Sequence, residues 1–287
     1  MINQQEDSLD NVLRDDWFVV CTAQRVTAFV KTTKLLGRPV AIWREEDGPV
    51  AAPYPSSKER YRAMDRYGYT WVSLGEPKAP LFLLPEFDQP GRRLIDCGAF
   101  GVRTSGLRMI ENFLDMGHFP YVHTEILGKE PHTEVKEYRV ALDDNDELWA
   151  TDCVFWQPKA AAAASSGMDV HYTYRVMQPF SAILYKSSPA RPDERDVIAL
   201  FVQPLSGVES RAHLMMLLYD EAHNDTELIA FQQTIFGQDK PILENQLPAR
   251  LPLGARAETP ARADAASIAY RRWLQRRGVT FGTVTSA

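Results

Sequence analysis

Residues 106–123 read GLRMIENFLDMGHFPYVH and contain the densest group of metal-ligand residue types in the chain. Large apolar residues recur in this stretch at spacings of three and four, as on one face of an α-helix. These residues are Leu107, Ile110 and Leu114. We therefore predict a helix over about 106–118 that loosens near Pro120, because a proline disfavours the helical conformation of the residue before it.

Several ligand-type side chains of this stretch fall on one face of the predicted helix, since Glu111, Asp115 and His118 stand at i, i+4 and i+7. His123 follows His118 by five residues, about 140° away on a continuous helix. Unwinding at Pro120 would let both imidazoles reach one point. Two imidazoles and one carboxylate with open positions form the facial triad of non-haem iron(II) enzymes. The spacing is also compatible with two ordinary core or surface histidines.

The local spacing does not identify a third protein ligand, because many carboxylates lie further along the chain. The candidates are Asp152, Asp169, Asp220, Asp225, Asp239 and Glu244. The local sequence of Asp239 favours a helix N-cap, because Pro241 follows it at a position typical of a first helical turn.

The 287 residues have the composition of a globular protein, with 45% hydrophobic and 24% charged residues. The length allows one large domain or two modest ones. A net charge of −6 and a pI near 5.6 argue against a nucleic-acid-binding surface. No apolar run approaches the roughly 18 residues of a membrane span, and the polar start MINQQEDSLD does not resemble a signal peptide. We therefore expect a cytoplasmic enzyme that binds neither nucleic acid nor membrane.

The three cysteines, Cys21, Cys97 and Cys153, are too few and too scattered for a disulfide framework. None of them begins a C-x-x-C or C-x-H pair. Iron–sulfur clusters and structural zinc sites need four cysteine or histidine ligands, usually in close pairs. We therefore expect no 2Fe–2S cluster held by this chain.

The first part of the chain predicts a small β subdomain. Short runs rich in aromatic and β-branched residues occupy 17–22, 39–43 and 67–74, and the proline-rich stretch 77–91 follows them as a crossing to the rest. We accordingly divide the chain into domains 1–80 and 81–287.

The second part predicts an α+β domain with one long antiparallel sheet. Strand-like segments dominate between about 135 and 220, interrupted by a low-complexity loop at 160–167. Helices are expected after this region, over 225–236, 239–246 and 264–277.

Four segments together resemble the Rieske non-haem iron aromatic oxygenases. ENFLDMGHFPYVH (111–123) resembles their iron-binding run E-N-F-x-D-x-x-H-x-x-x-x-H, and FGQDKPILENQ (236–246) resembles the segment with their carboxylate ligand. YGYTWV (67–72) is similar to the strand that closes their Rieske domain. AYRRWL (269–274) is similar to the C-terminal end of the subunits that act by O- or N-demethylation. These matches follow the family order across about 15–277.

The resemblance implies a helix-grip, START-like catalytic domain with a long antiparallel sheet, preceded by a small β remnant of a Rieske domain. It implies that His118, His123 and Asp239 bind a mononuclear Fe(2+). It also implies that Asp115 bridges to the Rieske histidine of a neighbouring subunit, for which a solvated or helix-capping carboxylate is the alternative. Asn112 corresponds to a residue near the metal in that family.

The chain departs from the family pattern where the cluster ligands belong. Family members carry C-x-H and C-x-x-H pairs before the YGxxWV strand, whereas here the interval is PYPSSKERYRAMDR (53–66), without cysteine or histidine. Electrons must then come from a different polypeptide with a Rieske centre, or not arrive at all.

Within the family, the chain is similar to Rieske-lacking catalytic subunits of bacterial methylxanthine N-demethylases. This similarity implies oxidative N7-demethylation of 7-methylxanthine to xanthine and formaldehyde. It also implies NADH or NADPH as the electron source through a Rieske-containing reductase, a glutathione-transferase-like structural subunit, and a trimer-based homo- or hetero-oligomer.

Three other interpretations stay open on the sequence: an O-demethylase or hydroxylase of another small aromatic compound, a non-catalytic accessory subunit, and a helix-grip module that binds a small ligand without metal. Bound iron distinguishes an oxygenase from the last two. Residues 180–185 and 201–203 are candidates for the substrate pocket, with ordinary core packing as the alternative.

Overall fold

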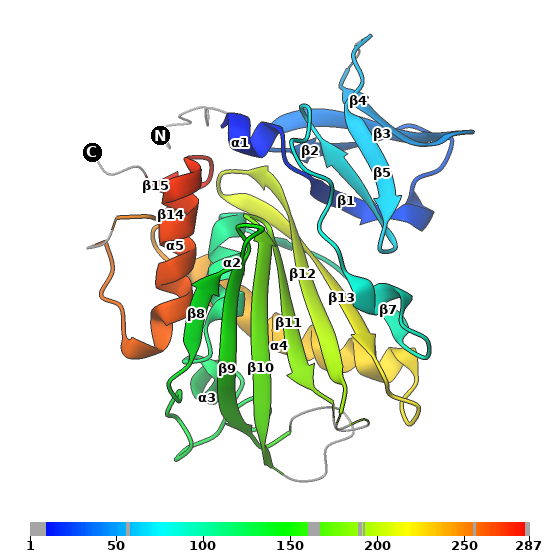
Figure 1. Ribbon diagram of the computed structural model, residues 1–287. Coiled ribbons are helices and arrows are strands. Elements are labelled where there is room, and N and C mark those ends of the chain that lie inside the picture. The colour runs from blue at the N-terminus through cyan, green and yellow to red at the C-terminus, as the bar shows by residue number, and fades with distance from the viewer. Residues whose placement is uncertain are drawn as a thin grey trace.

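The computed structural model describes residues 10–55, 58–159, 167–188, 191, 193–254 and 257–284. Its centre is a seven-stranded antiparallel sheet in the order β7-β13-β12-β11-β10-β9-β8 (Figure 1). The strands are β7 (Arg93–Val102), β8 (Arg139–Leu142), β9 (Leu148–Gln157), β10 (Met168–Gln178), β11 (Ser181–Ser187), β12 (Arg195–Ser206) and β13 (Glu209–Leu218). The predicted α+β class with a long antiparallel sheet is confirmed. The polar start MINQQEDSLD, except for Asp10, lies outside the described residues, and so does the predicted loop at 160–167, except for Gly167.

The helices are α1 (Asn11–Arg14), α2 (Gly106–Leu114), α3 (Phe119–Val122), α4 (Asp225–Asn245) and α5 (Ala265–Arg277), with 3₁₀ turns η1 (Ala23–Arg25), η2 (Pro85–Asp88) and η3 (Arg262–Asp264). Helices α2 and α4 lie behind the central sheet in Figure 1, α5 stands beside its β8 edge, and α1 lies apart from it near the N-terminal strands. No helix among the described residues is long and apolar enough to cross a membrane.

Helix α2 ends earlier than the sequence predicts. It begins at the Ser105 cap, whose side chain accepts a hydrogen bond from the Leu107 N–H, but it stops at Leu114 instead of continuing to 118. The Asp115 carboxylate accepts a hydrogen bond from the Gly117 N–H at 2.7 Å, and such a local turn competes with the helix. The chain therefore breaks at Asp115, and Pro120 lies in the first turn of the new helix α3, where proline is tolerated.

The two helices predicted over 225–236 and 239–246 are one helix, α4. Asn224 and Glu227 form a capping box at its start. The helix continues through Pro241, and its buried residues include Phe236 and Leu243 on either side of Asp239. The N-cap interpretation of Asp239 is therefore wrong, because the packing of buried residues on both sides of Pro241 outweighs the roughly 3 kcal/mol cost of an internal proline.

The N-terminal part forms a β module of two three-stranded sheets, in the orders β1-β6-β5 and β2-β3-β4. The strands are β1 (Phe18–Thr22), β2 (Lys31–Leu35), β3 (Arg38–Glu45), β4 (Gly48–Pro53), β5 (Arg62–Arg66) and β6 (Tyr69–Ser73). Three of these six strands, β1, β3 and β6, coincide with the strands predicted from the sequence, whereas β2, β4 and β5 were not predicted. A short parallel pair, β14 (Leu251–Pro252) and β15 (Thr283–Val284), joins the C-terminal segments. The domain division at residue 80 stays a prediction.

Aromatic side chains attach the β module to the outer face of the central sheet. Trp71 on β6 is fully buried, and its ring packs edge-on against Phe201 of β12, with ring centres 5.0 Å apart. The Tyr69 hydroxyl donates a hydrogen bond to the Asp96 carboxylate of β7 at 2.9 Å. Successive side chains of a strand point to opposite faces of the sheet. Phe201 of β12 therefore packs against the β module, whereas its neighbour Leu200 packs in the core on the other face.

His213 lies at the junction between the β module and the central sheet, and its burial predicts that the folded protein loses stability at acidic pH. It is 2% exposed, its ring packs edge-on against Tyr69, and its Nε2 has no hydrogen-bond partner among the described residues. Burial, with help from the positive charges of Arg211 and Arg25, lowers the pKa of His213 to about 3. The unfolded chain then binds a proton below about pH 6.5 that the folded chain does not bind.

We expect the free energy of unfolding to fall by roughly 1.4 kcal/mol for each pH unit between about pH 6 and pH 3 on account of His213. The stability should be fully present above that range. Urea unfolding at pH 7 and pH 5 tests this, with His213→Phe expected to lose this part of the pH dependence. The control is His171→Gln at an exposed histidine of β10. Equal pH dependence in wild type and His213→Phe would contradict the prediction.

Candidate metal centre

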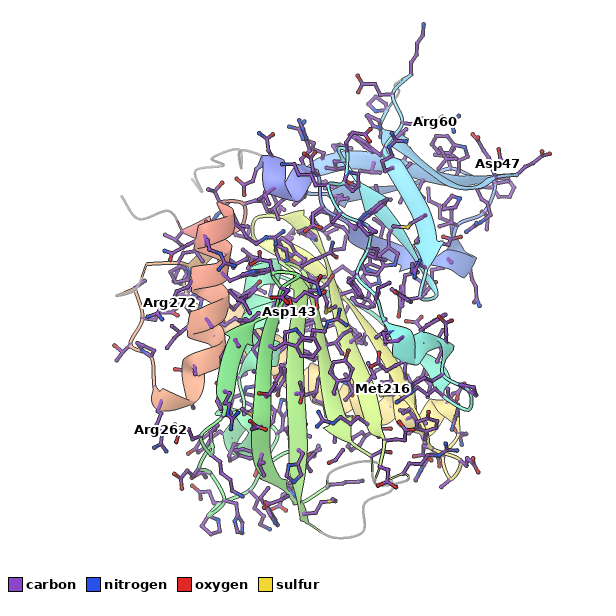
Figure 2. All side chains as sticks on the ribbon, viewed as in Figure 1. Asp47, Arg60, Asp143, Met216, Arg262 and Arg272 are labelled. Carbon is purple, nitrogen blue, oxygen red and sulfur yellow. The ribbon has the colours of Figure 1, made fainter. Side chains whose placement is uncertain are left out.

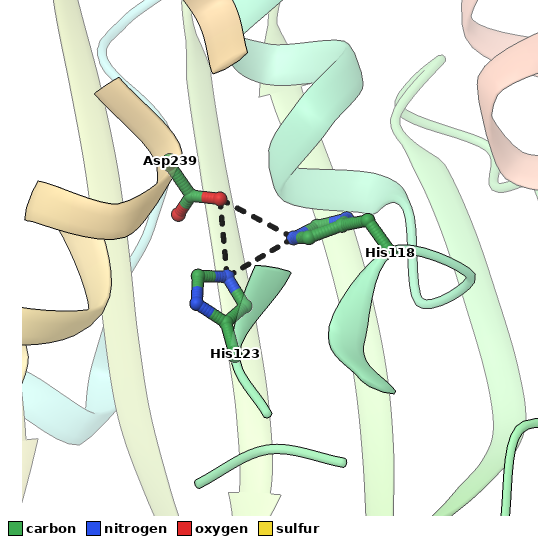
Figure 3. Close-up of side chains that lie close together, drawn as sticks. All are labelled: His118, His123 and Asp239. Carbon is green, nitrogen blue, oxygen red and sulfur yellow. Dashed lines mark hydrogen bonds and ion pairs between the residues drawn. The ribbon is translucent and has the colours of Figure 1, made fainter. Parts of the chain in front are cut away.

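Three elements bring two histidines and one aspartate together (Figure 3). His118 follows the end of α2 and caps the start of α3, and His123 caps the end of α3. Asp239 comes from the interior of α4. The early end of α2 turns the chain before His118, so that the one-turn helix α3 presents both imidazoles toward α4. The structure thus brings together the three residues that the resemblance selects as iron ligands.

The ligand atoms form a small triangle. His118 Nε2 lies 3.1 Å from His123 Nε2, and Asp239 Oδ1 lies 3.0 Å from His123 Nε2 and 3.3 Å from His118 Nε2. Two ligands at about 2.1 Å from a cation and about 90° apart lie about 3.0 Å from each other. The triangle therefore has the size of one face of an octahedral metal site.

Hydrogen bonds on the far side of each ring fix the tautomers. His118 Nδ1 lies 3.0 Å from Asp115 Oδ2, and His123 Nδ1 lies 2.9 Å from Gln238 Oε1. Both partners are acceptors, so each Nδ1 donates and each neutral ring directs an unprotonated Nε2 inward. Asp239 Oδ1 is buried without a hydrogen-bond partner among the described residues. Three acceptor atoms thus converge with no donor between them, which is the arrangement that a cation requires.

The pKa values of His118 and Asp239 also show that a positive charge is favoured between these side chains. Burial lowers the pKa of His118, but the carboxylates of Asp115 and Asp239 outweigh it and raise the pKa to about 9. Burial raises the pKa of Asp239, but the two facing imidazoles outweigh it and keep the carboxyl ionised. Without a metal, the site therefore holds a proton in place of the cation, and metal binding releases that proton.

The remaining candidate carboxylates are occupied elsewhere by ion pairs. The pairs are Asp152 with Arg139, Asp169 with Lys136, Asp220 with His223, Asp225 with Arg93, and Glu244 with Lys240. Glu111 also does not reach the triad. It pairs with Arg108 and Arg271, which links α2 to α5.

An apolar cavity opens beside the triad, between α4 and the inner face of the sheet. Its walls include Phe113, Tyr172, Leu184, Leu200, Phe231 and Phe236. The polar side chains on the walls include those of Asn112, Lys186 and Gln232. Of the pocket segments proposed from the sequence, Leu184 lines this cavity, whereas Tyr185 and Phe201 face the β module and belong to the core.

A surface groove lies on the other side of His118. It is lined by Asp115, Asn112 and residues of α5 such as Arg272. Figure 2 labels Arg272 on α5. His118 and Asn112 border both the groove and the cavity. Asp115 is 28% exposed, so its carboxylate connects a metal-facing imidazole with the protein surface.

Sequence reasoning missed two residues of the site, Gln238 and Lys186. Gln238 directly precedes Asp239 and orients His123, so its position in the FGQD segment was a usable signal. Lys186 lines the cavity from β11, and a lysine in a strand carries no sequence signal of burial.

A long antiparallel sheet and a long helix that enclose two histidines and one aspartate define the class of mononuclear non-haem metal enzymes. Residues 102–279 match the family described as Vanillate O-demethylase oxygenase C-terminal domain. The chain belongs to this family, which is part of the Rieske-type oxygenases, and is therefore an oxidoreductase for which the family implies non-haem iron.

Relatives of known description agree with this assignment. The chain is 48% identical over 272 residues to the "Probable methylxanthine N7-demethylase NdmC" of Pseudomonas sp. (strain TJI-51), covering 94% of this chain and 96% of that protein. It is 25% identical to the methylxanthine N1-demethylase NdmA of Pseudomonas putida, covering 78% of this chain and 62% of that protein. These similarities support an oxygenase of the N-demethylase type.

Solved structures share the fold. Pseudomonas putida CBB5 NdmA with caffeine superposes with a TM-score of 0.76 at 20% identity, covering 92% of this chain and 90% of that chain. Dicamba monooxygenase bound to dicamba gives a TM-score of 0.70 at 16% identity, covering 92% and 97%. At these identities the likeness concerns the fold alone.

If the triad binds iron, replacement of two aspartates of the same helix should affect iron binding differently. Asp239→Ala removes one of three converging acceptors and should abolish iron binding after anaerobic reconstitution, whereas Asp225→Ala in the first turn of α4 should keep wild-type iron. Iron per chain is measured by elemental analysis, with circular dichroism to check folding. Wild-type iron content in Asp239→Ala would contradict the assignment.

Proposed function

We propose that the chain is the iron-containing oxygenase component that removes the N7-methyl group of 7-methylxanthine, with electrons from a separate Rieske-containing reductase. The observation that carries the proposal is the triad of His118, His123 and Asp239 facing an apolar cavity. The substrate is inferred from the similarity to a protein described as a probable methylxanthine N7-demethylase.

The reaction balances as an oxygen insertion followed by a collapse. The N–CH₃ group, O₂, two electrons and two protons give N–CH₂OH and water, and the carbinol then breaks its C–N bond to give N–H and formaldehyde. Bound iron(II) supplies the activation of O₂. His118, His123 and Asp239 would hold that metal, and the cavity beside them would admit the substrate.

The cavity favours a flat, largely apolar ring system. Phe113 and Phe231 stand on its walls, and Leu184 and Leu200 close it from the sheet. Such walls exclude water from the reacting methyl group and bind aromatic faces by burial of apolar surface. These features support a small aromatic or purine substrate.

The electron donor is proposed to be external because the described residues offer no second metal centre. Among them, the triad is the one group of three or more histidine, cysteine or acidic side chains close enough to share a metal. Burial raises the pKa of the Cys97 and Cys153 thiols to about 12, so neither is a ready thiolate ligand. Electrons from NADH or NADPH would enter through the reductase at the groove beside Asp115.

The remaining parts of the proposal follow from the same family. The β module would be the counterpart of a Rieske domain without its cluster, with domains 1–80 and 81–287. The protein would act in the cytoplasm within a trimer-based homo- or hetero-oligomer that includes a glutathione-transferase-like structural subunit. Intact convergence of the triad favours a catalytic role over a purely accessory one, because the fold alone does not require three buried acceptors to meet.

Turnover tests the proposed function directly. Iron-loaded protein, a Rieske-containing demethylase reductase, NADH and 7-methylxanthine should give one formaldehyde for each xanthine formed, measured by a colorimetric assay and liquid chromatography. Omission of the reductase, or use of Asp239→Ala, should give none. Full iron content without formaldehyde would contradict the proposed substrate or donor.

The position of Asp115 between His118 and the groove predicts that its replacement lowers the activity without loss of the metal. Asp115→Asn keeps a hydrogen-bond acceptor for His118 but removes the charge, and should lower the rate of formaldehyde release by about 10- to 100-fold while iron content stays at the wild-type level. Asp169→Asn, the same change at a surface carboxylate that pairs with Lys136 outside the groove, is the control and should keep the activity. Unchanged turnover in Asp115→Asn would contradict a role in electron delivery.

A further inference from the structure

Tyr174 carries a buried hydroxyl group on the wall of the cavity beside the triad. The residue lies on β10, is 1% exposed, and lines the same cavity as His118 and Asp239. Its ring packs edge-on against Phe113 of α2, with ring centres 5.9 Å apart. The side chain therefore extends from the sheet to the helical side of the cavity, on which the three candidate ligands lie.

The hydroxyl of Tyr174 has no hydrogen-bond partner within the part of the chain that the structure describes. The preceding cavity tyrosine of the same strand, Tyr172, differs in this respect, because its hydroxyl accepts a hydrogen bond from the Gln157 amide. A buried hydroxyl without a partner costs free energy. A molecule that occupied the cavity and accepted a hydrogen bond from Tyr174 would remove this cost.

The surroundings of Tyr174 leave its hydroxyl proton available. Burial raises the pKa of this hydroxyl well above its usual range, so the group stays protonated at neutral pH. Its cross-strand neighbours are Leu184 of β11 and Ala150 of β9, whose side chains contain no acceptor atom. A hydrogen bond in such apolar surroundings is stronger than the same bond in water. Tyr174 can therefore act as a donor toward a ligand.

We infer that Tyr174 determines substrate specificity by donating a hydrogen bond to an acceptor atom of the heterocycle bound in this cavity, a carbonyl oxygen or an unsubstituted ring nitrogen. The inference rests on the proposed function, because it concerns the substrate of that same site. A methylated dioxopurine carries such acceptors around a flat ring. A ring of similar shape without acceptors would leave the hydroxyl unpaired, and a site with a buried donor rejects such a ligand.

The experiment compares two flat N-methylated bicyclic ligands that differ in their acceptor atoms. We would measure the binding of 7-methylxanthine and of 1-methylindole, which has neither a carbonyl group nor an unsubstituted ring nitrogen, to the iron-loaded full chain by calorimetry. Tyr174→Phe removes the hydroxyl and keeps the ring. It should weaken 7-methylxanthine binding by about 3- to 10-fold and bind 1-methylindole at least as tightly as the wild type does.

Two controls separate this inference from a structural role of the hydroxyl. Without ligand, Tyr174→Phe should keep the wild-type free energy of unfolding in urea, because the hydroxyl bonds to none of the described residues. Tyr61→Phe removes a hydroxyl from the N-terminal β module and should change neither affinity. A less stable Tyr174→Phe, equal losses for both ligands, or an unchanged affinity for 7-methylxanthine would overturn the inference.

The same measurements distinguish a failure of this inference from a failure of the proposed function. A loss of affinity in Tyr174→Phe that is confined to 7-methylxanthine supports the role of Tyr174 whether or not the ligand is turned over. If the wild type then released no formaldehyde, the proposed reaction would be contradicted and the role of Tyr174 in recognition would stand. Formaldehyde release together with equal affinities in wild type and Tyr174→Phe would contradict the role of Tyr174 alone.

Discussion

The arrangement of the centre depends on one electrostatic constraint, the meeting of three acceptor atoms in a buried place. His118 and His123 each use Nδ1 for a hydrogen bond to a neighbouring acceptor, so their Nε2 atoms face the Asp239 carboxylate without a donor. The raised pKa of His118 has the same cause: the carboxylates of Asp115 and Asp239 favour a positive charge at this place, which a proton can supply. The local backbone brings these three atoms together: α2 stops early, α3 is one turn long, and α4 continues past its proline.

The central sheet contacts the β module with one face and lines the cavity with the other. On β12, Phe201 packs against Trp71 of the β module, whereas the adjacent Leu200 lines the cavity. A one-residue change of register would exchange these roles, so the aromatic contacts with the module also hold the cavity wall in position. The N-terminal module therefore supports the shape of the cavity beside the triad from the opposite side of the sheet, and none of the described residues that line this cavity comes from the module.

The sequence was sufficient for the fold class and for strands such as β10, β11 and β12, but not for β2, β4, β5 and β7, nor for local breaks and caps. The resemblance selected Asp239 among six carboxylates where spacing alone favoured an N-cap. The end of α2 was misplaced because Pro120 is a stronger general signal than the side-chain hydrogen bond of Asp115, which stops the helix first. Pro241 was misleading for the same kind of reason, since apolar contacts on both sides of it stabilise the helix. The burial of Lys186 depends on what packs over β11, which local sequence does not specify.

The two sides of His118 fit the proposed function, in which another polypeptide supplies the electrons. Nε2 faces the buried cavity and Nδ1 faces the Asp115 carboxylate at a surface groove. A substrate in the cavity and a protein partner at the groove would then approach the same ligand from opposite directions without competing for space. Because the His118 imidazole stands between the groove and the cavity, electrons from the proposed partner would reach the triad through Asp115 without passing through the cavity.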